Sequence, residues 1–177
     1  MKLTDEEILA LLKHPDTKEK AFRSLLSNYQ ERLYYHVRRY VRNHEDANDI
    51  LQNTFIKTWN AIGQFQGNSA IYTWLYKIAS NEAITFINKQ KKINTTAIEQ
   101  SVVLHQGATD GLDAGVMAQR LQQAIDILPD KQKQVFIMRY YDELSYEEIA
   151  AIVDTSVGAL KASYHHAVKK IEDFLLS

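Results

Sequence analysis

Histidine is the side chain in this sequence best suited to chemistry, yet none of the six histidines stands in a pattern typical of an active site or metal site. They are His14, His36, His44, His105, His165 and His166, and none has a paired carboxylate or recognisable ligand spacing. Adjacent histidines on a helix point about 100° apart, which is poor geometry for holding one ion. The chain has no cysteine, which excludes thiolate zinc sites and cysteine nucleophiles. It also lacks a Gly-rich phosphate loop and a nucleophile elbow. We therefore expect no enzyme activity, no metal and no cofactor.

The last sixty or so residues instead carry a pattern typical of DNA reading. The run Ser145-Tyr146-Glu147-Glu148 is a capping box that opens a short helix, Asp154-Thr155 makes a turn, and Ser156 can cap a final helix. A short helix, a tight turn and a longer helix form the helix-turn-helix pattern, whose last helix begins in the major groove. An ordinary helical hairpin would have a similar pattern, so both interpretations remain open on this segment alone. Seven side chains are predicted to face DNA: Ser156, Ala159, Lys161, Ala162, His165, His166 and Lys169.

The elements that would position these residues are all helices. The box Thr4-x-x-Glu7 opens a short helix that ends at His14-Pro15, and apolar residues at steps of three and four predict helices over about 17–42, 46–62 and 69–91. The loop 63–68 is rich in glycine and polar residues. Residues 93–117 contain no Lys or Arg and no sustained periodicity, as in a flexible linker. The sequence predicts an all-α fold with a short N-terminal helix (1–15) and two small helical domains (16–92 and 118–177) joined by that linker.

The charge balance differs between the two predicted domains. The whole chain has a net charge of −1, but residues 1–92 hold 14 Lys and Arg against 10 Asp and Glu, whereas residues 118–177 hold 7 against 9. Phosphate contacts dominate affinity for nucleic acids, so we expect weak DNA binding by the chain alone and help from a larger partner. The acidic N-terminus and the absence of a long apolar run predict neither a signal peptide nor a membrane span, and hence a cytoplasmic protein.

Two long motifs in order resemble bacterial sigma factors. The segments Leu128–Phe136, Leu144–Ala150 and Ser156–Gly158 resemble, with matching spacing, the region-4 domain of these proteins. Independently, Asp46–Phe55 followed by Trp59 resembles region 2.2, and Tyr72–Asn81 resembles regions 2.3 to 2.4. The order, with only a linker between, is similar to the extracytoplasmic-function (ECF) group of the sigma-70 family.

The resemblance implies a set of polymerase and promoter contacts. In such proteins the region-2.2 helix binds the coiled coil of the polymerase β′ subunit; here Asp46, Asp49, Gln52 and Asn53 would make that contact. The loop 63–69 matches the family loop that captures a flipped base of the −10 element, an extrusion that costs a few kcal/mol. The side chains assigned to −10 recognition are Phe65, Gln66, Asn68, Asn81, Ile84, Thr85, Asn88, Lys89, Lys91 and Lys92.

Some of these features have an equally simple structural interpretation. The clusters Arg38-Arg39-Arg42 and Lys89–Lys92 lie near helix C-termini, where cations are favoured by the helix dipole as well as by phosphate. Trp59 and Trp74 lie on apolar stripes, which favours a place in the core over stacking on DNA. The final helix has Ala159 and His165-His166-Ala167 where the family has Thr and several Arg, so it offers fewer bidentate contacts to guanine.

The function implied is that of an alternative sigma factor. It would bind core RNA polymerase through the β′ coiled coil and the β flap, read the −10 and −35 elements of promoter DNA, and be held inactive by an anti-sigma factor. Two alternatives are a free-standing helix-turn-helix repressor or activator, and an adaptor that only binds proteins. The Asp49/Gln52 face discriminates a sigma factor from a free-standing repressor or activator, because a protein that binds DNA without polymerase has no use for this face.

Overall fold

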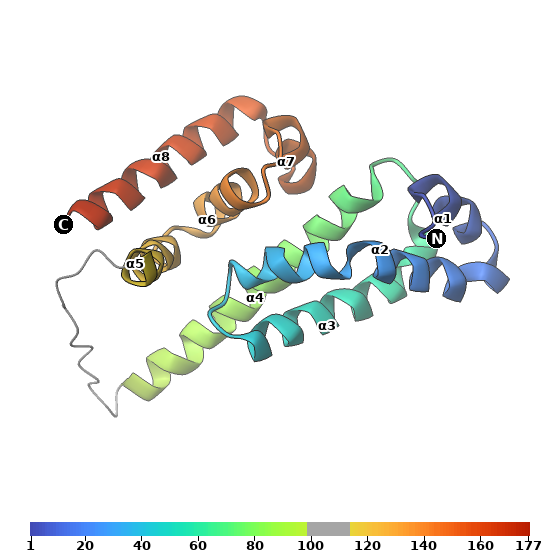
Figure 1. Ribbon diagram of the computed structural model, residues 1–177, viewed down its shortest axis with the longest axis horizontal. Coiled ribbons are helices and arrows are strands. Elements are labelled where there is room, and N and C mark those ends of the chain that lie inside the picture. Colours follow the sequence, from blue (N-terminus) through green and yellow to red (C-terminus); the bar gives the residue numbers. More distant parts are fainter. Residues whose placement is uncertain (99–113) are drawn as a thin grey trace.

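The computed structural model describes residues 1–98 and 114–177, and side chains within residues 1–95 and 114–177. Within these ranges every regular element is a helix (Figure 1). The N-terminal domain contains α1 (Asp5–Leu12), the 3₁₀ turn η1 (Pro15–Thr17), α2 (Lys18–Arg38), α3 (His44–Ala61), η2 (Ile62–Gln64) and α4 (Ile71–Ile98). The C-terminal domain contains α5 (Ala114–Asp126), α6 (Asp130–Phe136), the π-helical turn η3 (Ile137–Tyr141), α7 (Tyr146–Val153) and α8 (Val157–Leu176). The all-α, two-domain fold expected from the sequence is confirmed.

Side-chain caps fix where several helices begin. Thr4 and Glu7 form the predicted capping box of α1, and Ser145 and Glu148 form that of α7. Each box pairs two backbone N–H groups that a helix start leaves without partners. Helix α7 ends at Asp154, whose backbone is left-handed with a φ of 52°, and Ser156 then caps the N-terminus of α8.

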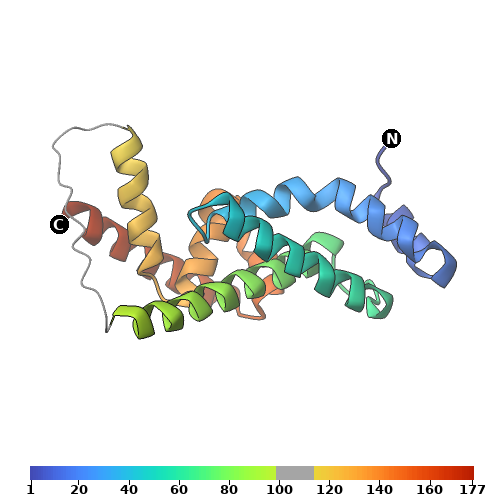
Figure 2. The same cartoon turned by 90° about the horizontal axis from the view of Figure 1, so that it is seen from below.

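Helices α2, α3 and α4 lie side by side and bury one core (Figures 1 and 2). Leu25 and Leu33 of α2, Ile50 of α3 and Leu75 of α4 are among its fully buried side chains. The periodicity favoured a place in the core for the apolar stripe of α3, but this prediction is wrong for part of the stripe. Leu51 and Phe55 are half-buried and Trp59 is 38% exposed, so a second apolar face points out of the bundle.

The C-terminal domain wraps α5, α6 and α7 against α8. Its core contains Ile125 of α5, Phe136 of α6, Ile149 of α7, and Leu160 and Ile171 of α8. Ala150 of α7 packs against this core, in which Leu160 of α8 is buried.

The structure differs from the predicted linker at both ends. Helix α4 continues to Ile98, and α5 begins at Ala114, so the ends of the segment 93–117 are helical. Helix elongation needs no apolar stripe once a long helix is established, which is why periodicity did not reveal the last turn of α4. The remainder of the predicted linker, with His105, lies outside the described residues.

The two domains pack against each other, a point on which the sequence carries no signal. Figure 1 shows α6 and α7 on the side of the C-terminal domain that faces α2 and α4. Helix α7 contacts α4, and the turn η3 contacts α2.

Candidate polymerase and nucleic-acid interfaces

The outer face of α8 presents all seven residues predicted to read the −35 element. Ser156, Ala159, Lys161, Ala162, His165, His166 and Lys169 are exposed, whereas Leu160, Ala167 and Ile171 are buried on the opposite side. The Oγ atom of Ser156 accepts a hydrogen bond from the Ala159 backbone N at 3.2 Å, which fixes the start of the helix. The His165 and His166 ring centroids are 6.1 Å apart.

The polar face of α3 carries the residues predicted to bind polymerase. Asp49, Gln52 and Asn53 are exposed. Asp46 is different, because it is tied into the start of the helix: its backbone N donates to Asn43 Oδ1 at 2.8 Å, and its Oδ2 accepts from Asn43 Nδ2 at 3.0 Å. Asp46 therefore serves the cap of α3 and is less accessible than the other three.

This polar face shares a groove with α4. Asp49, Gln52 and Asn53 line a hollow of about 450 Å³ together with Thr85 and Lys89. Two predictions made from separate motifs, polymerase binding on α3 and −10 reading on α4, thus meet at one surface.

Sequence reasoning missed an apolar groove on the other side of the same α3 residues. It has a volume of about 500 Å³ and is lined by Phe22, Asn48, Leu51, Gln52, Phe55, Ile56 and Trp59. Ile56 is 52% exposed. Trp59 has an edge contact with Phe22 at 5.1 Å and the Lys18 ammonium 4.2 Å from its ring centroid. The available signal was the width of the apolar stripe, since five of the ten residues from Ile50 to Trp59 are large and apolar, more than one buried helix face holds.

The loop before α4 commits one of its three predicted side chains to packing. The Phe65 ring is half-buried, with its centroid 4.8 Å from that of Trp74. Gln66 and Asn68 are exposed, and Asn68 Nδ2 lies 3.5 Å from Gln66 Oε1. Gly67 between them has φ of +74°, a conformation that favours glycine. The polar pair is therefore held at the tip of the loop, while Phe65 anchors its base. Trp74 is half-buried, in keeping with the predicted place in the core.

The residues predicted on α4 are presented unequally. Asn81, Thr85, Lys89, Lys91 and Lys92 are exposed. Ile84 is instead half-buried and packs against the core, because its position completes the apolar stripe. Asn88 is half-buried and donates from Nδ2 to Asp130 Oδ2 of the C-terminal domain at 3.0 Å.

The arginine cluster at the end of α2 makes structural contacts. Arg38 Nη1 donates to the Val41 carbonyl at 2.9 Å, near the helix C-terminus. The guanidinium of Arg39 lies 4.0 Å from the ring centroid of Tyr141, and Arg42 pairs with Asp126. Two of the three arginines therefore contact the C-terminal domain in this arrangement.

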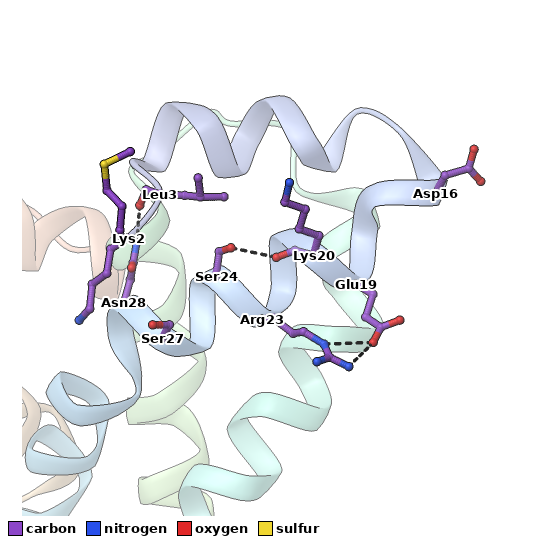
Figure 3. A pocket seen from close by; sticks show the side chains of 10 residues that line it. Lys2, Leu3, Asp16, Glu19, Lys20, Arg23, Ser24, Ser27 and Asn28 are labelled. Carbon is purple, nitrogen blue, oxygen red and sulfur yellow. Dashed lines mark hydrogen bonds and ion pairs between the residues drawn. The ribbon is translucent and has the colours of Figure 1, made fainter.

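A further hollow, of about 530 Å³, lies between the N-terminal segment and α2 (Figure 3). Two polar interactions lie along it: Asn28 Nδ2 donates to the Leu3 carbonyl at 2.7 Å, and Arg23 pairs with Glu19 at 2.6 Å, whereas Asn28 Oδ1 is buried without a hydrogen-bond partner. The Asn28 hydrogen bond fastens the segment before α1 to α2.

In the described part of the chain, no group of three His, Cys, Asp or Glu side chains is arranged to hold a metal ion. Nor does any helix in it have the length and apolarity needed to cross a membrane.

The two domains have clear counterparts among known families. Residues 25–93 match sigma-70 region 2, and residues 118–171 match sigma-70 region 4. A helical region-2 bundle followed by a helix-turn-helix region 4 defines a bacterial transcription initiation factor, and this chain belongs to the sigma-70 family.

Individual relatives place it in the ECF group. It is 36% identical over 160 residues to the RNA polymerase sigma factor YlaC of Bacillus subtilis (strain 168), covering 88% of this chain and 90% of the relative. It is 34% identical over 182 residues to the ECF RNA polymerase sigma-E factor of Escherichia coli (strain K12), covering 97% and 94%. As a member of this group, the protein is an alternative sigma factor that directs promoter-specific transcription initiation. Sigma factors are non-catalytic initiation factors.

Solved structures support the same fold. The sigma factor RpoE of Bartonella quintana, in complex with the anti-sigma factor NepR, superposes with a TM-score of 0.65 at 24% identity, over 88% of this chain and 97% of that one. CnrH in complex with the cytosolic domain of CnrY gives a TM-score of 0.68 at 19% identity, over 97% and 96%.

Proposed function

We propose that this sigma factor binds core RNA polymerase through α3. The supporting observation is the composition of that helix surface, where the exposed row Asp49, Gln52 and Asn53 runs beside an exposed apolar groove. An amphipathic helical partner needs both, because its apolar stripe fills a groove while its flanking charges pair at the rim. The β′ coiled coil is such a partner. The groove supplies buried contact area, and Asp49 supplies charge complementary to a basic helix.

We further infer that residues 16–92 read and melt the −10 element and that residues 118–177 read the −35 element. Gln66 and Asn68 at the loop tip would contact a flipped base, with Asn81, Thr85 and Lys89 on α4 continuing along the DNA. Amide side chains can pair with base edges, and lysines with phosphates. The exposed face of α8, which starts at Ser156, would enter the major groove. The C-terminal domain would also contact the β flap.

Three expectations complete this proposal. The chain would contribute no catalytic residue, since nucleotide addition belongs to the polymerase. It would act in the cytoplasm, where polymerase and promoters are found. An anti-sigma factor would regulate it, an expectation supported by the neighbouring folds whose solved complexes contain NepR and CnrY.

Pull-down with purified core polymerase, together with run-off transcription, tests the proposal. The double variant Asp49→Ala with Gln52→Ala should lose most core binding and transcription. Glu45→Ala with Asn60→Ala is the matched control, because both residues are exposed on α3 and line neither of its grooves. Unchanged core binding by the first variant would remove the assignment of this face. A wild-type protein that neither binds core nor starts transcription would refute the proposal as a whole.

A further inference from the structure

Lys133 of α6 carries a buried ammonium group that no carboxylate balances. The residue is 2% exposed, and its Nζ atom donates to the Asp126 backbone carbonyl at 3.2 Å. None of the ion pairs among the described residues includes it. Burial, followed by the charge of Lys91, lowers the pKa of Lys133. Because buried charges in proteins are normally paired with an opposite charge, this ammonium group is suited to bind an anion.

Lys133 lines a hollow of about 330 Å³ between the two domains. Lys91 of α4 and Arg42 of the turn between α2 and α3 line the same hollow, so three cations meet there. Two carboxylates are also in its wall, but both already have partners: Asp46 bonds within the cap of α3, and Asp126 accepts from Arg42. The cations exceed the carboxylates by one, and the most deeply buried cation is the unpaired one.

A second, larger hollow adjoins the first, because Val41 and Arg42 line both. It has a volume of about 810 Å³ and lies between the end of α2 and α5, and small-molecule sites of this size often occur between domains. Its charged lining consists of Arg38, Arg39, Arg42 and His44, and no carboxylate is among the described residues that line it. Both hollows therefore favour a negatively charged ligand.

Arg38 and Arg39 are held by contacts that leave donors for such a ligand. Arg38 uses Nη1 to bond the Val41 carbonyl at 2.9 Å. The guanidinium of Arg39 lies over the Tyr141 ring at 4.0 Å, a contact that uses its face and leaves its N–H edge. A guanidinium has five N–H donors in one plane, and it binds phosphate through two of them at once. Arg42 is engaged in its ion pair and mainly adds positive charge.

The larger hollow also offers an exposed aromatic ring. Tyr35 is 58% exposed, and its ring meets that of Tyr34 edge-on at 5.7 Å. Tyr34 is held in turn by a hydrogen bond to His44, whose ring is parallel to its own at 6.0 Å. The face of an aromatic ring stacks on any nucleobase. On the opposite wall, Gln119 and Gln123 of α5 expose amides, which can pair with the edge of a base.

We propose that the two adjoining hollows form a binding site for a nucleoside triphosphate. The base stacks on Tyr35 in the larger hollow. The phosphate chain contacts Arg38 and Arg39 and ends in the smaller hollow, where it pairs with Lys133 beside Lys91. An anion without a base would leave the exposed ring unused, and a base without phosphates would leave the buried ammonium unpaired. The proposal does not depend on the proposed function, because the site is complete without polymerase or DNA.

Isothermal titration calorimetry of the full chain with ATP tests the proposal. Wild type should bind with a dissociation constant on the order of 10–100 µM. Lys133→Met should keep the fold, because it removes a desolvated charge and retains an apolar stem, and should weaken binding by about ten-fold or more. Tyr35→Ala should weaken it by about five-fold or more, through the lost stacking. Lys131→Met and Tyr140→Ala are the matched controls, since both residues are exposed and line neither hollow.

Partial ligands separate the two halves of the site. Inorganic tripolyphosphate and adenosine should each bind at least about ten-fold more weakly than ATP, because each makes only part of the contacts. Either of them binding as tightly as ATP, no ATP binding at about 1 mM, or equal weakening in the control variants would overturn the proposal. Displacement of ATP by a short single-stranded oligonucleotide at low micromolar concentration would assign the hollows to nucleic acid and overturn it as well. Core binding and run-off transcription by the wild type, measured without added ligand, show separately whether the proposed function holds.

Discussion

The imidazole of His36 lies with Nδ1 2.6 Å from Oδ2 of Asp142, across the boundary between the two domains. His36 is fully buried, and its Nε2 atom has no hydrogen-bond partner. The ring packs 4.6 Å from Tyr76 and 5.2 Å from Tyr40, centroid to centroid. A buried donor that depends on one acceptor in the other domain couples the stability of the N-terminal domain to domain contact.

Asp142→Ala should therefore destabilise the protein. The substitution leaves both ring nitrogens of His36 without partners, and an unsatisfied buried polar group costs about 1–3 kcal/mol. Asp142→Asn retains an acceptor oxygen and should lose less than half as much. Urea unfolding followed by circular dichroism measures both changes. Equal destabilisation by the two variants would show that the hydrogen bond to His36 is not the source of the loss.

The Tyr72–Glu148 contact should give domain closure a pH dependence. The hydrogen bond from Tyr72, then that from the Ser145 backbone, holds the pKa of Glu148 below its usual value of 4.5. A carboxyl whose folded pKa is depressed stabilises the fold above the unfolded pKa, and that stabilisation is lost as pH falls through the folded pKa. The substitution Tyr72→Phe removes the hydrogen bond that lowers the pKa of Glu148 most.

The stability difference between wild type and Tyr72→Phe should thus be full at pH 7 and shrink as the pH falls below about 4.5. Urea unfolding at pH 7, 5, 4 and about 3 measures it. Tyr40→Phe is the control, because the buried Tyr40 hydroxyl has no hydrogen-bond partner, so its effect should not vary over this range. A Tyr72→Phe difference that is constant with pH would contradict the assigned cause.

The apolar groove on α3 predicts a binding defect without a folding defect. Ile56 is 52% exposed in this groove, so Ile56→Asp costs the free protein little but puts a carboxylate where an apolar partner surface would be desolvated. Core polymerase affinity, measured by pull-down or anisotropy, should fall at least ten-fold while the thermal midpoint stays within a few degrees. Asn60→Asp, which puts a carboxylate on an exposed residue of α3 outside both grooves, should retain core binding.

Local signals in the sequence predicted much of this fold. The Thr4 and Ser145 capping boxes, the Ser156 cap and the exposed face of α8 follow from residue types at short spacings, because caps and amphipathic stripes depend on neighbours within one or two turns. The family motifs then supplied the order of the two domains. These are the features that need no knowledge of distant contacts.

The features that the sequence did not reveal depend on long-range packing. Asn88 looks like a free α4 residue until Asp130, 42 positions later, is seen to accept its hydrogen bond. Arg42 likewise resembles a phosphate-binding arginine, although Asp126 occupies it. Periodicity also assigned Trp59 to the core. An apolar stripe has the same periodicity whether the protein's own core or a binding partner covers it, so the pattern cannot distinguish the two. Composition showed the charge asymmetry of the domains, but only the contacts show which charges meet.

Ser156 combines two roles that substitutions can separate. Its Oγ caps α8 by accepting from the Ala159 backbone N at 3.2 Å, and its exposed position is the first of the predicted DNA face. Ser156→Ala should cost about 1 kcal/mol of stability, the usual loss of a helix N-cap. Ser156→Asp preserves the cap, since a carboxylate accepts the same bond and is favoured at a helix N-terminus, yet it places a negative charge against the DNA backbone. The aspartate variant should therefore keep wild-type stability and lose most −35-dependent transcription, whereas the alanine variant shows a smaller transcription loss with a measurable drop in thermal midpoint.

Thermal unfolding and run-off transcription on a promoter of the regulon measure the two effects. Full activity of Ser156→Asp would show that the start of α8 does not approach DNA.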